Sequence, residues 1–208
     1  MTSRWRLATV RHGETDYNKE GRYAGTIDVS LNENGRNDSR RASKIIVDMK
    51  FDVLIASPLK RAIETAQILT NGCVEIIPCP YARERDYGIL QGRTSEDVDL
   101  IRPPIHFIKI GGDYHSLDPP GAETFEELRV RAARLLYFVL ENFKGRRVLL
   151  VSHGVFLQQF HGVLRGQDWV EALGAHVNNL ILTTFDFEDD RVVSEDQMSL
   201  TTREQSDF

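Results

Sequence analysis

The chain contains a short pattern twice, in which a histidine precedes a glycine. Segment 11–13 reads Arg-His-Gly and segment 152–154 reads Ser-His-Gly, and each follows an apolar run. A third basic side chain, Arg61, follows another apolar run. If these side chains converge, two guanidinium and two imidazole groups repel one another unless they enclose a multivalent anion. Guanidinium groups bind phosphate oxygens in pairs, so the sequence predicts a phosphoryl-binding pocket.

A metal site is the competing interpretation of the same residues. His12, His153 and Glu84 are of types that ligate transition metals. Arginines beside a divalent cation would weaken its binding, and the chain has no His-x-His or His-Glu-x-x-His pattern. The two cysteines, Cys73 and Cys79, match no zinc-ligand spacing, and a strand between them would hold them too far apart for a disulfide. We therefore expect no metal and no other cofactor.

The elements that would carry these residues alternate between strand and helix. Apolar runs at 5–10, 52–56 and 147–152 predict short strands. Apolar residues at spacings of three and four over 124–143 are typical of an amphipathic helix. This alternation predicts an α/β fold, a three-layer α/β/α sandwich around a mostly parallel central sheet. Residues at the carboxyl ends of the strands would then meet at one edge, where such sheets bind ligands.

Turn residues and periodicity predict the other elements. The stretch 12–30 is rich in Gly, Asn, Asp and Thr, and we expect a loop there. Further helices are expected at 33–49, 57–70 and 155–164, and further strands at 73–78, 179–187 and 191–195. Because a domain typically has about 150 residues, the default is a single catalytic domain over residues 1–208.

Six motifs in order along the chain are similar to those of one enzyme family. The sequence resembles the histidine phosphatase superfamily, the phosphoglycerate-mutase-like enzymes, over about residues 7–165. The resemblance rests on RHGETDYNKEGRYAG (11–25), the following segment with Asp28, Leu31 and Gly35, SPLKRAIETA (57–66), ERDYGILQG (84–92), PGAET (120–124) and SHGV (152–155). It implies a phosphoglycerate-mutase-like fold.

The resemblance also implies a role for each matching residue. His12 would be the nucleophile that becomes a phosphohistidine. Arg11, Arg61 and His153 would hold the phosphoryl oxygens and stabilise charge in the transition state. Glu84 would be the general acid that protonates the leaving oxygen, and then the base that activates water.

Two alternatives stay open for the acid. Residues 83–86 (Arg-Glu-Arg-Asp) could form an exposed charge run, and Asp86 is a second candidate. The spacing to Tyr87-Gly88 and Gln91-Gly92 fits the family from Glu84 and favours it.

The resemblance further implies residues that contact the substrate. These are Asn18, Ala24, Gly25, Tyr87 and Gly154. Ala24 stands where many family phosphatases have glutamine, so a side-chain hydrogen bond to the substrate is lost. Four histidines match no motif, and we expect them to be surface or satisfied core residues: His106, His115, His161 and His176.

The segment between Glu84 and Glu123 bears on the type of activity. A mutase would need a longer basic insert with paired arginines, whereas these two residues are only 39 apart and no Arg-Arg pair lies between them. The sequence therefore favours a metal-independent phosphomonoesterase that hydrolyses a small phosphorylated metabolite. A cofactor-dependent phosphoglycerate mutase and a non-catalytic phospho-ligand-binding module stay open. We expect a lid insertion at about 93–120, in which the apolar stretch 101–112 either covers the substrate or serves local packing.

Charge and hydropathy limit the partners. The net charge of −5 disfavours non-specific binding to nucleic acid. Residues 186–208 hold eight acidic and two basic side chains, so the rest of the chain is close to neutral. No apolar run approaches the roughly 20 residues of a membrane span, and the first residues lack an apolar signal region. We expect a cytoplasmic protein with no membrane partner; a homodimer is left open, and a flexible tail is expected at about 199–208.

Overall fold

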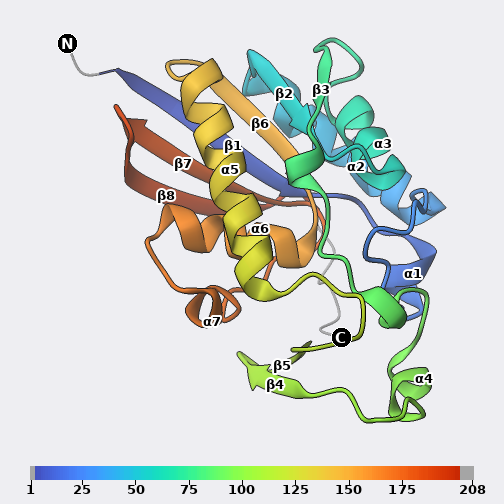
Figure 1. Cartoon of the computed structure of the whole chain (residues 1–208). Coiled ribbons are helices and arrows are strands. Elements are labelled where there is room, and N and C mark those ends of the chain that lie inside the picture. The colour runs from blue at the N-terminus through green and yellow to red at the C-terminus, as the bar shows by residue number, and fades with distance from the viewer. Residues whose placement is uncertain (1–2, 202–208) are drawn as a thin grey trace.

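A sheet of six strands runs through the middle of the computed structural model, which describes residues 3–201 (Figure 1). Its strands are β1 (Arg4–Arg11), β2 (Val53–Ala56), β3 (Ile76–Pro78), β6 (Arg147–Ser152), β7 (Ile181–Glu188) and β8 (Arg191–Ser199). They lie in the order β3-β2-β6-β1-β7-β8. The first four pair in parallel, and β7 and β8 continue the sheet antiparallel beside β1. The mostly parallel sheet predicted from the sequence is confirmed.

Helices cover both faces of this sheet (Figure 1). The pair on one face is α2 (Glu33–Asp48) with α3 (Lys60–Leu69), and the pair on the other is α5 (Phe125–Phe143) with α6 (Gly154–Leu164). Successive residues of a strand point to opposite faces, so Leu7 of β1 packs in the core beneath α5 and α6, whereas Ala8 packs beneath α2 and α3. The expected three-layer α/β/α sandwich is confirmed.

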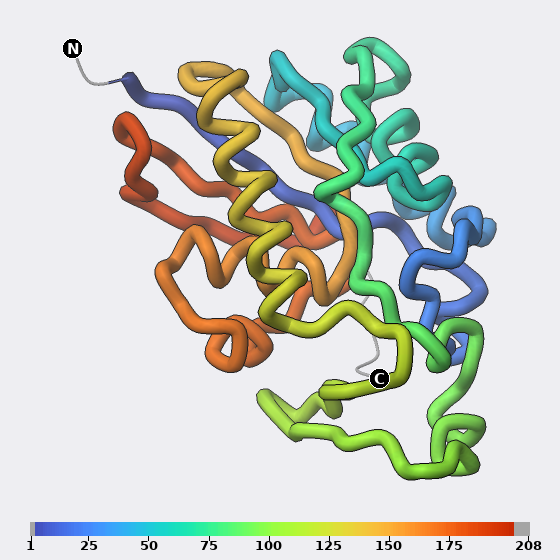
Figure 2. Tube along the Cα trace, viewed as in Figure 1, coloured from blue at the N-terminus to red at the C-terminus, as the bar shows by residue number. Residues whose placement is uncertain are grey.

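After β3 the chain leaves the sheet, and it forms a separate arm before α5 begins. We use "the arm" for residues 93–120, which contain α4 (Ser95–Asp99), β4 (Phe107–Ile110) and β5 (Asp113–Ser116). β4 and β5 form a hairpin that is not part of the central sheet. Figure 2 shows the arm in green to yellow-green, apart from the layered body. The remaining short elements are α1 (Asp16–Lys19), α7 (Trp169–Ala172) and single 3-10 turns at Pro80–Ala82 and Gly88–Leu90.

Two strands differ in extent from the prediction. The strand expected over 73–78 is limited to Ile76–Pro78, because only Leu54, Ile55 and Ala56 of β2 pair with it. The last strand extends to Ser199 rather than ending at residue 195, because β7 supplies partners along its whole length. Leu200 follows in the core, and residues 202–208 of the expected tail lie outside the described residues.

Two further features concern the hydropathy of the helices and the state of the cysteines. Within residues 3–201, no helix is both long and apolar enough to cross a membrane. α5 has 19 residues, but charged side chains such as Glu126 and Arg134 interrupt it. Cys73 is exposed, Cys79 is buried, and both are free thiols.

Candidate active site

The two His-Gly segments lie side by side at the carboxyl ends of β1 and β6. These strands pair in parallel with Arg11 opposite Ser152, so His12 and His153 leave the sheet together. The centroids of their rings are 5.1 Å apart. Arg61, from the first turn of α3, reaches both rings: its Nε is 3.2 Å from His12 Nε2 and 3.1 Å from His153 Nδ1. The structure thus brings together the basic residues that the sequence singles out.

Hydrogen bonding determines which ring nitrogen of His12 carries the proton. Nδ1 is 2.7 Å from the carbonyl oxygen of Gly13, and it must carry the proton in order to donate. Burial above all, and then the charges of Arg61 and Arg11, hold the pKa of His12 well below its usual range. The ring is therefore neutral at pH 7, and Nε2 keeps its lone pair. Nε2 is therefore the nucleophilic nitrogen of His12, and in this structure it accepts a hydrogen bond from Arg61 Nε.

Two buried donors of this cluster have no hydrogen-bond partner within residues 3–201. Arg61 donates to His153 Nδ1, so the proton of neutral His153 is on Nε2, which is unpartnered. Arg11 donates from Nη1 to the carbonyl oxygen of Val177 at 2.8 Å, but its Nε is unpartnered. Gly154 leaves room for this guanidinium, because a Cβ there would lie 3.3 Å from Arg11 Cζ. Unpaired buried donors are costly, and an anion with several oxygens supplies the missing acceptors.

Arg61 is oriented by the backbone of the 12–30 loop. Its Nη1 donates to the carbonyl oxygen of Ile27 at 2.8 Å, and its Nη2 to that of Gly25 at 2.7 Å. Gly25 has a φ of 52°, and a Cβ there would lie 2.2 Å from Gln91 Oε1, so only glycine fits. Burial lowers the pKa of Arg61 to about 10, which leaves it charged at neutral pH.

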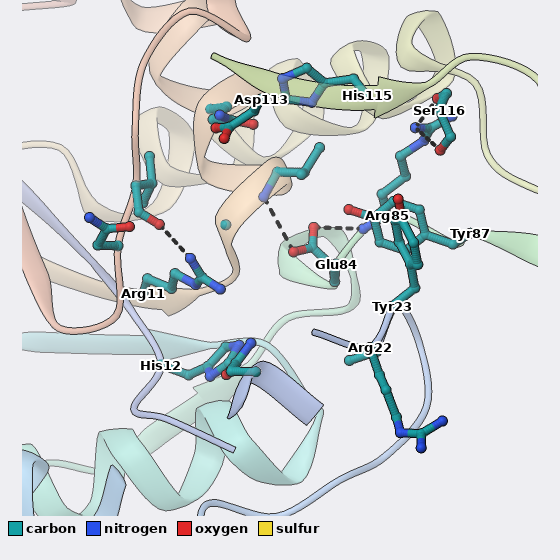
Figure 3. Close-up of a pocket in the computed structure, with 18 of the residues that line it drawn as sticks. Arg11, His12, Arg22, Tyr23, Glu84, Arg85, Tyr87, Asp113, His115 and Ser116 are labelled. Atoms are coloured by element: carbon teal, nitrogen blue, oxygen red, sulfur yellow. Dashed lines mark hydrogen bonds between the residues drawn. The ribbon is translucent and has the colours of Figure 1, made fainter. Parts of the chain in front are cut away.

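The Glu84 carboxylate lies at the amino end of α6, beside the same cavity (Figure 3). Its Oε1 accepts hydrogen bonds from the backbone N–H groups of Arg85 at 2.8 Å and Phe156 at 2.9 Å, and its Oε2 accepts one from Val155 at 3.3 Å. The first N–H groups of a helix lack partners inside the helix, so this carboxylate satisfies them. Glu84 is thereby fixed near Arg11, with which it interacts electrostatically.

The structure contradicts the exposed charge run and places Asp86 away from the cavity. Residues 83–86 are not an exposed charge run, because Arg85 is buried and its Cζ lies 3.9 Å from the ring centroid of Phe125. The Asp86 carboxylate accepts a hydrogen bond from a backbone N–H two residues on, at 2.8 Å, and lines a different cavity. Of the two candidates for the acid, Glu84 lines the cavity and Asp86 does not.

A cavity of about 370 Å³ opens beside these groups. Nine of the predicted site residues line it: Arg11, His12, Asn18, Ala24, Gly25, Arg61, Glu84, Tyr87 and Gly154. His153 is fully buried and does not belong to the lining. Asn18 completes the capping box of α1, in which its Oδ1 accepts a hydrogen bond from the N–H of the N-cap residue Thr15 at 3.1 Å. Tyr87 packs edge-on against Tyr23, with ring centroids 5.2 Å apart.

One of the four unmatched histidines, His115, contradicts its prediction as a surface or satisfied core residue. His115 is only 7% exposed, yet its Nε2 has no partner within residues 3–201. His176 also lines the cavity, and its Nδ1 is 3.2 Å from Asp113 Oδ2. The other three unmatched histidines fit their prediction: His176 and His106 are exposed partners of Asp113 and Asp118, and His161 is buried beside a Thr9 hydroxyl.

The part of the arm that reaches the cavity is not the stretch predicted to do so. Residues 113–116, the whole of β5, line the cavity, whereas residues 101–112 do not. The sequence contains a signal for this hairpin, because Gly111-Gly112 separates two short runs and both glycines have positive φ. Gln158 of α6 completes this wall, and no motif marks it.

The donor set fits an anion better than a metal cation. Among the residues that the structure describes, no group of three or more His, Cys, Asp or Glu side chains could hold a metal ion. At the cavity, His12 stands beside the guanidinium groups of Arg11 and Arg61. Cations on both sides of the imidazole favour a phosphoryl group instead.

Comparison with known proteins identifies relatives along nearly the whole chain. The family profile described as the histidine phosphatase superfamily (branch 1) matches residues 7–197. "Uncharacterized phosphatase PhoE" of Bacillus subtilis is 30% identical over 186 residues, which cover 89% of this chain and 90% of that protein. A 2,3-bisphosphoglycerate-dependent phosphoglycerate mutase of Parvibaculum lavamentivorans is 36% identical, covering 71% of this chain and 74% of that protein. The solved structure of Bacillus stearothermophilus YhfR superposes with a TM-score of 0.79 at 25% identity, covering 90% and 94% of the two chains.

Proposed function

The chain belongs to branch 1 of the histidine phosphatase superfamily, and from that premise we propose that it is a metal-independent phosphomonoesterase. It hydrolyses a small phosphorylated metabolite through a phosphohistidine at His12. One observation carries the proposal: the neutral imidazole of His12, whose Nε2 has a lone pair, lies among buried donors, two of which (Arg11 Nε and His153 Nε2) lack acceptors. A phosphoryl group placed at this point meets a nucleophile and satisfies those donors together.

In the first step, His12 Nε2 attacks the phosphorus atom and the bond from phosphorus to the ester oxygen breaks. Protonated Glu84 gives its proton to that oxygen, so the alcohol leaves neutral. Arg11 and Arg61 hold the charged phosphoryl oxygens, with His153 Nε2 as a further donor. In the second step Glu84 takes a proton from water, the water oxygen attacks phosphorus, and the bond to His12 breaks to release inorganic phosphate.

The His12→Ala variant tests this mechanism. Because the variant lacks the nucleophile, we expect hydrolysis of p-nitrophenyl phosphate to fall to background, with no acid-labile phosphoprotein after rapid quenching. Wild-type protein should form that phosphoprotein and should keep its activity in EDTA. The exposed His106→Ala variant is the matched control and should behave as wild type. Activity retained in His12→Ala, or lost with the chelator, would contradict the proposal.

A phosphoglycerate mutase is the second candidate, because relatives at comparable identity carry that name. A mutase must return the phosphoryl group to a second acceptor before water reaches it. The two activities separate in one assay, in which 3-phosphoglycerate is supplied with and without 2,3-bisphosphoglycerate. We expect release of inorganic phosphate from a phosphate ester rather than isomerisation. Phosphate binding without turnover of any ester would instead favour a non-catalytic phospho-ligand-binding module.

A further inference from the structure

The wall of the cavity formed by the arm differs in chemistry from the wall formed by the strand ends. Figure 3 shows His115 and Asp113 on the opposite side of the cavity from His12. Gln158 of α6 lines the same cavity. The strand-end side contributes cations and N–H donors, whereas Asp113 contributes a carboxylate and Gln158 contributes an amide. The mechanism above uses none of these three residues.

The amide of Gln158 presents an acceptor that is unsatisfied. Its Nε2 donates to the carbonyl oxygens of Ala175 at 2.7 Å and Leu173 at 3.5 Å. Exchanging the oxygen and nitrogen would set an oxygen against two carbonyls, so the contacts fix the orientation. Gln158 is only 5% exposed, and its Oε1 has no partner within residues 3–201. A buried acceptor of this kind requires a donor from a ligand.

His115 adds a second unsatisfied group on the same wall. It packs edge-on against Phe125, with ring centroids 6.4 Å apart, so the ring is held in place. Burial above all lowers the pKa of His115, which leaves the ring neutral at pH 7. A neutral imidazole donates at one nitrogen and accepts at the other, so the unpartnered Nε2 suits a hydroxyl group.

We propose that Gln158, His115 and Asp113 form an alcohol subsite that selects phosphate esters of uncharged, hydroxyl-rich alcohols. This inference rests on the proposed function, because that function assigns the strand-end side of the cavity to the phosphoryl group. Hydroxyl groups donate to Gln158 Oε1 and to the Asp113 carboxylate, and they pair with His115 in either direction.

Other leaving groups fit this wall less well. A carboxylate-bearing alcohol brings acceptors and a charge that Asp113 repels. An apolar alcohol leaves the buried groups of Gln158 and His115 unpaired. An ammonium group would pair with the Asp113 carboxylate, but Arg11, Arg61 and Arg85 line the same cavity and their charges repel it.

The test uses esters that differ only in the alcohol. Glycerol 3-phosphate, propyl phosphate and 3-phosphoglycerate share three carbons and the phosphoryl group, and phosphoethanolamine adds the ammonium case. Binding is measured by calorimetry on the His12→Ala variant, so that the result does not depend on turnover. We expect glycerol 3-phosphate to bind at least about tenfold more tightly than each of the others, since its hydroxyls pair with otherwise unpaired groups.

Two substitutions, each made in the His12→Ala background, assign that preference to the subsite. His115→Phe keeps the ring beside Phe125 but removes Nε2, so we expect weaker glycerol 3-phosphate binding and unchanged propyl phosphate binding. Asp113→Asn removes the repelling charge, so 3-phosphoglycerate should bind more tightly than before, a gain that a folding defect would not produce. His106 is on the same arm but outside the cavity, so His106→Phe should change the binding of neither glycerol 3-phosphate nor 3-phosphoglycerate.

The outcomes separate this inference from the proposed function. Equal or tighter binding of 3-phosphoglycerate or propyl phosphate overturns the subsite, as does an equal effect of His115→Phe on all esters. A protein that hydrolyses p-nitrophenyl phosphate but shows no such preference keeps the proposed function and loses the subsite. A protein that shows the preference but hydrolyses no ester keeps the subsite and loses the proposed function.

Discussion

Arg61 contributes geometry as well as charge to the site. Its guanidinium donates at the same time to two imidazole rings and to the carbonyl oxygens of Gly25 and Ile27. We expect Arg61→Lys to lower kcat/KM for p-nitrophenyl phosphate by roughly 10²- to 10³-fold, because one ammonium group cannot replace that set of donors. Arg36→Lys is the control, since Arg36 pairs with Glu64 outside the cavity. Near-normal activity in Arg61→Lys would show that charge alone suffices.

The role of Glu84 can be tested through the leaving group. Glu84→Gln keeps an oxygen for the backbone N–H groups of α6 but cannot transfer a proton. Alkyl alcohols need that proton and p-nitrophenol does not, so glycerol 3-phosphate hydrolysis should fall by roughly 10²- to 10⁴-fold. The first-turnover burst of p-nitrophenol should be nearly unchanged in stopped-flow traces. Asp86→Asn is the matched control, and a larger effect there than in Glu84→Gln would reverse the assignment.

Among single residues, those at the strand ends can be predicted from the sequence, whereas those on the cavity wall formed by the arm and α6 cannot. Residues 11–13 and 152–154 stand out because type, spacing and a preceding apolar run agree. His115 and Gln158 have no such context. Their unpaired atoms exist only because the hairpin and α6 enclose them in one cavity, which is a tertiary fact that no local pattern contains.

Among the elements, the β4–β5 hairpin is attached to the body in part by one buried side chain, Arg85. Arg85 donates from Nη1 to the Ser116 carbonyl oxygen at 2.7 Å and from Nε to that of Glu123 at 2.8 Å. We expect Arg85→Met to increase amide hydrogen exchange of residues 107–116 and to raise KM, while β1 and β6 stay protected. Arg83→Met, at an exposed neighbouring position, is the control. Unchanged exchange in the hairpin of Arg85→Met would contradict this role.

The elements of the sheet and of its covering helices follow from periodicity, but the arm does not. The strands at 5–10 and 147–152 and the helix at 124–143 bury regular apolar patterns, so their positions agree with the sequence. β4 and β5 have four residues each, and most of their side chains are partly exposed. Two such strands bury too little apolar surface for a recognisable pattern, and Arg85 instead fixes their position.

For the whole molecule, buried neutral histidines make stability dependent on pH. Burial lowers the pKa of His161 to about 3, and the pKa values of His12 and His153 are lowered as well. In the unfolded chain these rings titrate near pH 6.5. Below that pH the unfolded state binds protons that the folded state does not, so this stability is complete above about pH 6.5 and is lost as pH falls from there toward 3.

The expected slope is up to about 1.4 kcal/mol of unfolding free energy per pH unit for each such histidine. Urea unfolding at pH 7, 6 and 5 measures it. His161→Phe removes one of these groups at a position outside the cavity, so the slope should decrease by up to about 1.4 kcal/mol per pH unit. A free energy of unfolding that is constant between pH 7 and pH 5 would contradict this account.

The fold also shows where the acidic residues of the last segment lie relative to basic residues of β1. The acidic residues at 186–208 look separate from a nearly neutral body in the sequence. In the fold, β7 pairs with β1, which sets Asp186 opposite Arg6 and Glu188 opposite Arg4. Arg6 Nε lies 2.7 Å from Asp186 Oδ1. Part of this acidity is therefore neutralised across the sheet.

The attachment of the arm through Arg85 has an evolutionary consequence. The residues proposed to attack and hold the phosphoryl group stand at the ends of β1 and β6 and at the starts of α3 and α6, whereas His115 and Asp113 belong to a hairpin outside the central sheet. Because the hairpin does not pair with the central sheet, changes in its sequence need not alter the pairing of the strands that hold those residues. On the assignment proposed above, substitutions within residues 113–116 would change the preferred alcohol during evolution while the residues proposed for the reaction stay in place.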